Sequence, residues 1–280
     1  MNLILYETRT DPFTTYAVAR AAGFSDSDAF QYAYWSQYPD QNPAFDASKN
    51  FLNESVGKYL HSLTGGDPVK LRKYLECLLK SSKFSLAESG MLIHALGDAY
   101  AHTYTDNNKF LGSPRNQRLN PNYGKDVLFP PRIGHFFSGH APDFIGNNPK
   151  KYGEYVDQLY ETMQSLNPGG NYDPSTINNL KLQAYLMPPS SLMSDVFTSD
   201  AQNENSNEAF RLGILSGGYY GSSNLFNPDG SVKTLRDTFT EQWNMPVDSI
   251  FGDSRNSLIQ KIKNGVSGCC PGVSGCCPNN

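Results

Sequence analysis

The chain has 280 residues, enough for one large domain or two small ones with a substantial hydrophobic core. Its 27 acidic and 23 basic residues give a formal net charge of −4, so the charge balance does not support nucleic-acid binding, although single strands could still stack on the many aromatic side chains. The first residues do not resemble a signal peptide, and no later stretch resembles a membrane span. We therefore expect a soluble protein made in the cytoplasm, with export by a route that needs no cleaved signal as an open alternative.

Two helices joined by a glycine turn are predicted near the start of the chain. Asp11 is typical of a helix N-cap, Gly23 is typical of a helix end, and Ser25 begins a second helix that should end at Pro39-Asp40. An antiparallel pair of this kind brings Asp11 close to Asp40. On local grounds alone, Asp11 is an ordinary cap and Asp40 is an ordinary turn residue.

Residues 41–66 show only weak helical periodicity, and we interpret His61 within them as a surface or packing histidine. A stronger helix follows Asp67. Cys77 lies on the apolar face of that helix and is expected to be a small core residue, so the fold should not depend on disulfides. A central helix is then predicted from about Ser85 to Tyr104.

Residues 107–147 show no sustained period, and a loop of this length inside a compact domain is usually functional or disordered. Helical patterns resume at 149–166 and 175–186, and two more follow at 207–215 and 232–243. Strand signals are scarce. The predicted fold is therefore all-α, a multi-helix bundle around a metal site with long irregular loops.

The end of the chain carries the sequence G-V-S-G-C-C-P twice, at 265–271 and 272–278. Paired cysteines can bind a soft metal, oxidise or accept a lipid, but this spacing is not that of a zinc site. We expect a single domain over residues 1–264 and a flexible tail over residues 265–280.

The central helix carries His94, Asp98 and His102 at strict four-residue intervals. Each such step advances about 40° around a helix, so the three side chains fall within an arc of roughly 80°. The opposite side of this helix is apolar and is predicted to be buried. Buried polar groups need partners, and imidazole and carboxylate are the ligands that zinc takes.

Two further histidines and an aspartate lie in the 107–147 loop, namely His135, His140 and Asp143. Four of the five histidines in the chain therefore fall within about fifty residues of one another. Together with Asp11 and Asp40, these residues would supply eight ligands, which is too many for one tetrahedral zinc and suits two or three neighbouring ions. The plainer alternative is that these histidines and aspartates only satisfy one another in a helical core.

Neighbouring divalent ions can clamp the attacking and leaving oxygens of a phosphoester displacement, and a metal-bound water ionises near neutral pH. A carboxylate oxygen that is not bound to metal can orient that water. We therefore assign catalytic roles to Asp40 and Asp98, and Asp98 is the best candidate for a bridging ligand because it lies in the middle of the stripe.

The sequence H-A-L-G-D-A-Y-A-H resembles a helix of the superfamily of zinc-dependent phospholipases C and single-strand-specific zinc nucleases. The resemblance is closer to a bacterial group of uncharacterised phospholipase-like proteins and toxin C-terminal domains, and it covers about residues 8–165. The matching motifs are D-P-F-T from Asp11, A-A-G-F-S from Ala21, S-Q-Y-P-D from Ser36, and the pair G-H and H-A-P-D that contains His135, His140 and Asp143.

This resemblance implies a zinc-dependent hydrolase of phosphoesters, with a phospholipid head-group ester as the expected substrate and transient contact with a membrane surface. The chain departs from the superfamily pattern because it has no N-terminal tryptophan ligand and no second helix with a His-x-x-x-Glu or His-x-x-x-Asp pair. Two alternatives stay open: a toxin domain with nuclease or other hydrolase activity at the same site, and a non-enzymatic helical protein whose metal is structural.

Overall fold

The computed structural model describes residues 11–42, 44–47, 50, 52–105, 126–131, 145–187 and 252–265. The fold of this part of the chain is all-α, as predicted. It contains eight α-helices, a short 3-10 helix and one two-stranded antiparallel sheet. The elements are α1 (Asp11–Ala21), α2 (Asp26–Gln41), α3 (Glu54–Leu60), α4 (Pro68–Leu79), α5 (Leu86–Ala101), β1 (Thr103–Thr105), β2 (Asp126–Leu128), η5 (Ile145–Asn147), α7 (Pro149–Leu166), α8 (Pro174–Leu186) and α11 (Gly252–Asn264).

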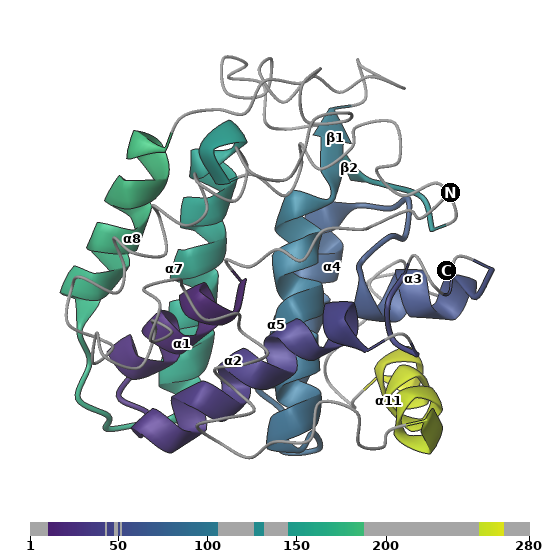
Figure 1. Cartoon of the computed structure of the whole chain (residues 1–280), viewed down its shortest axis with the longest axis horizontal. Coiled ribbons are helices and arrows are strands. Elements are labelled where there is room, and N and C mark those ends of the chain that lie inside the picture. Colours follow the sequence, from purple (N-terminus) through teal and green to yellow (C-terminus); the bar gives the residue numbers. More distant parts are fainter. Residues whose placement is uncertain are drawn as a thin grey trace, which may run out of the picture.

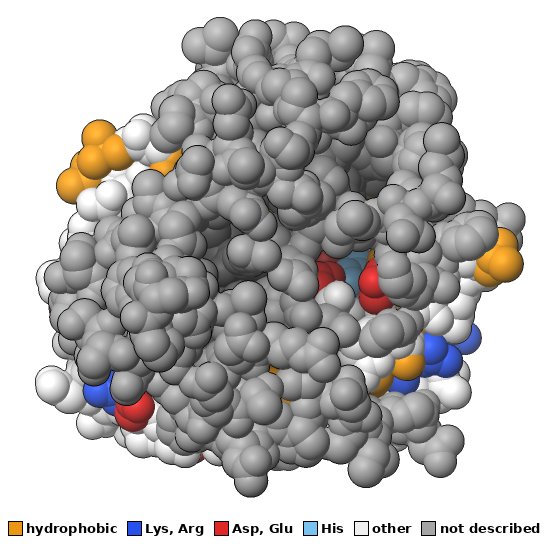
Figure 2. Space-filling view, viewed as in Figure 1, with side chains coloured by type: hydrophobic (Ala, Val, Ile, Leu, Met, Phe, Trp, Pro, Cys, Tyr) orange, Lys and Arg blue, Asp and Glu red, His pale blue; other side chains and the backbone are white. Residues whose placement is uncertain are grey.

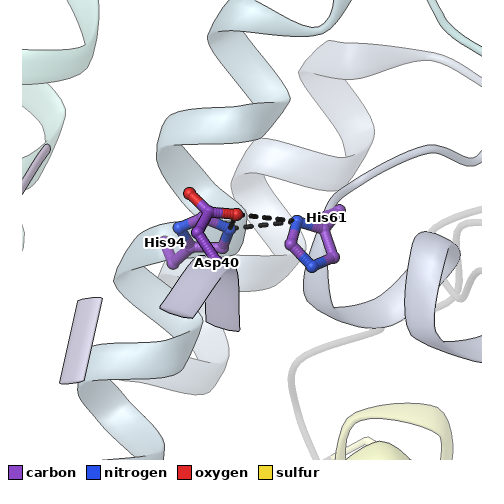
Figure 3. Close-up of side chains that lie close together, drawn as sticks. All are labelled: Asp40, His61 and His94. Atoms are coloured by element: carbon purple, nitrogen blue, oxygen red, sulfur yellow. Dashed lines mark hydrogen bonds and ion pairs between the residues drawn. The ribbon is translucent and has the colours of Figure 1, made fainter. Parts of the chain in front are cut away.

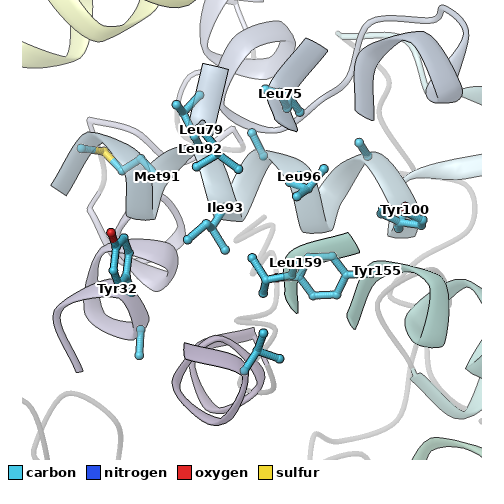
Figure 4. Close-up of a cluster of buried hydrophobic side chains, with 14 of the residues drawn as sticks. Tyr32, Leu75, Leu79, Met91, Leu92, Ile93, Leu96, Tyr100, Tyr155 and Leu159 are labelled. Atoms are coloured by element: carbon cyan, nitrogen blue, oxygen red, sulfur yellow. The ribbon is translucent and has the colours of Figure 1, made fainter. Parts of the chain in front are cut away.

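Helix α5 stands at the centre of the molecule, and α2, α4 and α7 pack around it (Figure 1). Every residue from Ser89 to Tyr100 is buried, so α5 is covered on all sides, not on one apolar face alone. Side chains of α4, including Leu75 and Leu79, lie on one side of it, and Tyr155 and Leu159 of α7 lie on the other (Figure 4). The polar side chains of α5 in this range, including His94 and Asp98, therefore lie in the protein interior.

The end of α5 differs from its prediction. Its start is a capping box between Ser85 and Glu88, but the helix ends at Ala101, three residues before the predicted end at Tyr104. Residues Thr103–Thr105 instead form β1, which pairs with β2 in the register Thr103 with Leu128. The two β-branched threonines favour an extended strand, and the partner strand lies inside the segment that the sequence predicted to be a loop.

The helix pair α1–α2 follows the prediction at its turn. Gly23 adopts φ +82°, and a Cβ there would lie 2.7 Å from the backbone nitrogen of Asn171, so both the turn and the close approach of the α7–α8 connection require glycine. Ser25 caps α2 as expected. The helix was predicted to end at Pro39-Asp40, and it continues one residue further, to Gln41. Pro39 lies in the last turn, where its missing N–H removes only one helical hydrogen bond.

Cys77 is partly buried against the core and is disulfide-bonded. The expectation of a simple core thiol is therefore wrong. Helix α11 was not predicted either, although Leu258, Ile259 and Ile262 bury one face of it.

The helical predictions at 149–166 and 175–186 are confirmed by α7 and α8. The helices predicted at 207–215 and 232–243 and the tail from residue 266 onward lie outside the described residues.

Among the helices described, none is long and apolar enough to cross a bilayer.

Candidate metal centre

Three side chains from separate elements meet beside the middle of α5 (Figure 3). His94 comes from α5, Asp40 comes from the last turn of α2, and His61 directly follows α3. Each offers one ligand atom, and these atoms all lie within 4.8 Å of one another, close enough to hold a metal ion. Because α2 continues two residues beyond Pro39, Asp40 still lies on a helix that packs against α5.

The separations within this group are close to those around a bound ion. Nδ1 of His61 lies 3.1 Å from Nε2 of His94. Oδ1 of Asp40 lies 3.7 Å from the first nitrogen and 3.6 Å from the second. Ligand atoms on a tetrahedral zinc with bonds of about 2.0–2.1 Å lie roughly 3.3–3.4 Å apart. The three atoms therefore need to move by only a few tenths of an ångström, on the order of rotamer adjustment, to share one ion.

Asp98 forms a second triangle with the same two nitrogens. Its Oδ2 lies 3.3 Å from Nδ1 of His61 and 3.3 Å from Nε2 of His94. This oxygen is buried, and it makes no hydrogen bond of normal geometry within the described residues. A buried carboxylate oxygen left in this state is costly, and a cation beside the imidazoles would satisfy it. The donor set therefore fits a divalent ion such as zinc.

The charge on Asp98 is set by two opposing effects. Burial would raise the pKa of its carboxyl group, but the imidazoles of His102 and His94, together with the nearby ring nitrogen of His61, hold that pKa well below its usual range. Asp98 is therefore ionised wherever the protein is folded near neutral pH. An ionised carboxylate is the form that a metal ion binds.

A backbone carbonyl fixes which nitrogen of His61 faces the group. Nε2 of His61 lies 2.9 Å from the carbonyl oxygen of Phe45, and because a carbonyl only accepts, Nε2 carries the hydrogen. Nδ1 then presents its lone pair towards His94 and Asp40. Partners of this kind orient metal-binding histidines in many proteins.

His102 borders the group but lies outside it. Because α5 ends at Ala101, His102 is the residue that follows the helix, and its Nδ1 lies 3.2 Å from the carbonyl oxygen of His61 and 3.6 Å from Oδ2 of Asp98. The sequence predicted His102 as a third ligand on the helical stripe. Its departure from the helix turns this nitrogen towards a backbone carbonyl.

The structure brings together Asp40, His94 and Asp98 from the predicted set, with His102 beside them. His135, His140 and Asp143 lie outside the described residues, and so does the side chain of Asp11. His61 was missed as a site residue. It was interpreted as a surface or packing histidine, and the surface alternative is wrong because only 3% of it is exposed. It follows a short helix with weak periodicity, so no spacing pattern linked it to α5.

The group opens to solvent on one side. The side chain of Asp40 is 21% exposed, whereas those of His61 and His94 are 4% and 1% exposed. Acidic and histidine atoms are visible together at the molecular surface (Figure 2). An ion held here would thus have two buried nitrogen ligands and a carboxylate that reaches water.

No family model, no curated protein and no solved structure matches this chain.

Proposed function

We propose that this protein is a metal-dependent hydrolase of phosphoesters, with zinc as the ion that best suits its imidazole and carboxylate ligands. The observation that carries the proposal is the asymmetry of the site, in which two buried imidazoles face one carboxylate that reaches solvent. Catalytic zinc sites keep three protein ligands and one open position, whereas structural sites are closed.

Each side chain has a role in this proposal. His61 and His94 would hold the ion, and the ion would supply an ionised water near neutral pH. Asp40 would add the third ligand atom, Oδ1, and because its side chain reaches the opening, its second carboxylate oxygen is placed to orient that water. Asp98 stays ionised and adds a second negative charge beside the imidazoles.

The proposed substrate is a phosphodiester of a phospholipid head group. The net charge of −4 would repel a nucleic-acid backbone and weakens the case for a nuclease. A head-group ester is cleaved at the membrane surface, which an enzyme needs to touch only transiently.

The test is elemental analysis of the purified protein for zinc, followed by hydrolysis assays with bis(p-nitrophenyl) phosphate and p-nitrophenylphosphorylcholine. His61→Ala and His94→Ala should lose both metal and activity. Asp40→Asn should lower kcat by about 100-fold or more. Its matched control is Asp28→Asn, which changes an acidic residue in the first turn of the same helix and should leave activity unchanged.

Two results would overturn the proposal in different ways. Protein that contains no divalent metal and takes none up has no metal centre. Protein that is loaded with metal but inert on every phosphoester is not a hydrolase of this class.

A structural metal is the second candidate, and one observation favours it. The buried Oδ2 of Asp98 lies near both imidazoles and could close the coordination that Asp40 leaves open. In that case chelation would unfold the protein, and small anions such as phosphate would not compete for the ion. In the hydrolase, phosphate should inhibit competitively.

A further inference from the structure

Helix α11 packs against α3 and against the segment that precedes it (Figure 1, yellow). Leu258, Ile259 and Ile262 bury its apolar face. The hydroxyl of Tyr74 in α4 donates a hydrogen bond to the carbonyl of Ile262, and Lys261 forms an ion pair with Glu88 at 2.6 Å. The helix therefore rests on the side of the molecule that carries His61.

Arg255 extends from α11 to the backbone of the connection between α2 and α3. Its Nη1 donates a hydrogen bond of 2.5 Å to the carbonyl oxygen of Ala44 and lies 3.3 Å from Oδ1 of Asn50. A guanidinium is always charged in proteins, and its hydrogen bonds to carbonyl oxygens are stronger than those between neutral groups. Arg255 thus fixes a backbone position that is more than two hundred residues away in the sequence.

The next residue along the chain is the one that orients His61. The carbonyl of Phe45 accepts the hydrogen bond from Nε2 of His61, and its N–H donates to the carbonyl of Asn42 at 2.8 Å. The ring of Phe45 is fully buried against that of Tyr38, with the centroids 5.3 Å apart. Arg255 therefore binds the carbonyl of one peptide unit, and His61 binds the carbonyl of the next.

We propose that Arg255 is a positioning residue for the metal centre. By binding the carbonyl of Ala44, it keeps the carbonyl of Phe45 where it directs Nδ1 of His61 towards His94. Without Arg255, the 44–45 peptide loses the hydrogen bond on its carbonyl and keeps that from the N–H of Phe45 to Asn42, so the next peptide unit, whose carbonyl orients His61, is held less firmly. The inference rests on the proposed metal centre but does not depend on hydrolysis. It extends the site to α11, which the sequence motifs do not include.

The test uses the full-length protein loaded with Co²⁺, whose visible absorption reports the ligand set. Arg255→Met keeps the aliphatic stem and removes the guanidinium, and Arg255→Lys keeps one charged donor. Loss of an outer partner of a metal-binding histidine costs about 10–100-fold in metal affinity. Arg255→Met should therefore weaken Co²⁺ binding by at least about tenfold and shift the absorption bands, with partial recovery in Arg255→Lys.

The matched control is Lys261→Ala, which removes an ion pair on the same helix without touching the 44–45 peptide. It should leave the Co²⁺ affinity and spectrum unchanged, even where it lowers the unfolding temperature as much as Arg255→Met does.

Wild-type affinity and spectrum in Arg255→Met would overturn the inference. So would equal losses of affinity in Arg255→Met and Lys261→Ala, since these would reflect only the docking of α11. If Arg255→Met does not fold, Arg255→Lys is compared with Arg255→Gln. The inference is supported when Arg255→Lys keeps the wild-type Co²⁺ spectrum and affinity and Arg255→Gln does not. It is overturned when the two variants have the same spectrum and affinity. Wild-type protein that binds no Co²⁺ would instead overturn the metal centre itself.

Discussion

The imidazole of His61 meets that of His94 edge to face, with ring centroids 4.9 Å apart, planes at 88° and Nδ1 of the first 3.1 Å from Nε2 of the second. Since Nε2 of His61 carries a hydrogen for the carbonyl of Phe45, the hydrogen between the two rings belongs to His94 when both are neutral. An ion bound by the proposed metal centre would take the place of this hydrogen. Metal and protons would therefore compete for the same two nitrogens.

The first prediction is that zinc affinity rises with pH. Acid protonates the imidazoles, and a protonated imidazole cannot bind metal. Between pH 5.5 and 7.5 the affinity, measured by competition with a chelator of known proton dependence, should rise by about tenfold or more. Calorimetry in buffers with different ionisation enthalpies should show that protons are released on binding. A flat profile would mean that the ion is held by carboxylates and not by His61 and His94.

The second prediction concerns Gly90, where α5 crosses α2. A Cβ at Gly90 would lie 2.3 Å from Cβ of Trp35 and 3.1 Å from its backbone. Gly90→Ala must therefore push the two helices apart, which should cost about 1–3 kcal/mol of the free energy of unfolding. Because Gly90 lies one turn before His94 and α2 carries Asp40, the same change should weaken zinc binding. Urea unfolding and chelator competition measure the two effects.

Gly97→Ala is the control on the same helix. A Cβ there would lie 3.6 Å from the ring of Tyr155, which is ordinary van der Waals contact. Alanine is favoured over glycine in a helix interior, so this change should stabilise the protein by roughly 0.5–1 kcal/mol. If Gly90→Ala and Gly97→Ala changed the free energy of unfolding equally, close packing at the α2–α5 crossing would not explain the glycine at position 90.

The four-residue spacing of α5 was sufficient to predict that His94 and Asp98 share a polar stripe on a buried helix. Helical periodicity is a local property, so it can be read without knowing what packs against the helix. The helix itself ends earlier than its period predicted, because Thr103 pairs with a strand 25 residues later, and His102 therefore follows α5 while its Nδ1 lies 3.6 Å from Oδ2 of Asp98. Pairing with a distant strand leaves no trace in the local period.

His61 could not be predicted as part of the site for a related reason. It follows a seven-residue helix and precedes Ser62, whose backbone has φ +54° and whose hydroxyl donates a hydrogen bond of 2.6 Å to the carbonyl of Ala95. That turn directs the imidazole of His61 towards α5, and the turn itself depends on the hydrogen bond from Ser62 to Ala95 of α5. The residues next to His61 in the sequence therefore do not specify the turn.

The third prediction tests that turn. Ser62 is buried in a left-handed conformation that β-branched residues adopt only with strain. Ser62→Val should lower the free energy of unfolding by about 2 kcal/mol or more, and it should weaken zinc binding through His61. In Ser62→Gly the relief of strain offsets the lost hydrogen bond, so its stability should lie close to that of the wild type. Equal losses in both variants would show that the hydroxyl alone matters.

The fourth prediction follows the pH dependence of stability through Glu88. Burial would raise the pKa of its carboxyl group, but hydrogen bonds from Lys261 and from Ser85, with the charge of Lys261, lower it. Because the pKa of Glu88 is lower in the folded protein, its ionised carboxylate contributes stability at pH values above the unfolded-state pKa of about 4.3. This contribution is lost as the pH falls through the lower pKa of the folded state. Glu88→Gln should therefore show a flatter decline of stability between pH 5 and 3 in urea unfolding, while its neutral side chain can still complete the capping box. A decline as steep as that of the wild type would contradict this role of Glu88.

The fifth prediction concerns the buried ion pair between Lys151 of α7 and Asp126 of β2, which holds the sheet against the helices. Lys151 also donates a hydrogen bond of 2.6 Å to the hydroxyl of Thr103 in β1. Lys151→Met leaves the carboxylate of Asp126 without its cation, which should lower the free energy of unfolding by about 3–5 kcal/mol. The double variant Lys151→Met with Asp126→Leu removes both charges and should recover most of that loss. The control is Lys150→Met, whose side chain is 52% exposed and whose pair with Glu154 spans 3.9 Å, so its effect should stay within about 0.5 kcal/mol. A double variant as unstable as Lys151→Met would show that the hydrogen bond to Thr103, rather than charge pairing, is what this lysine contributes.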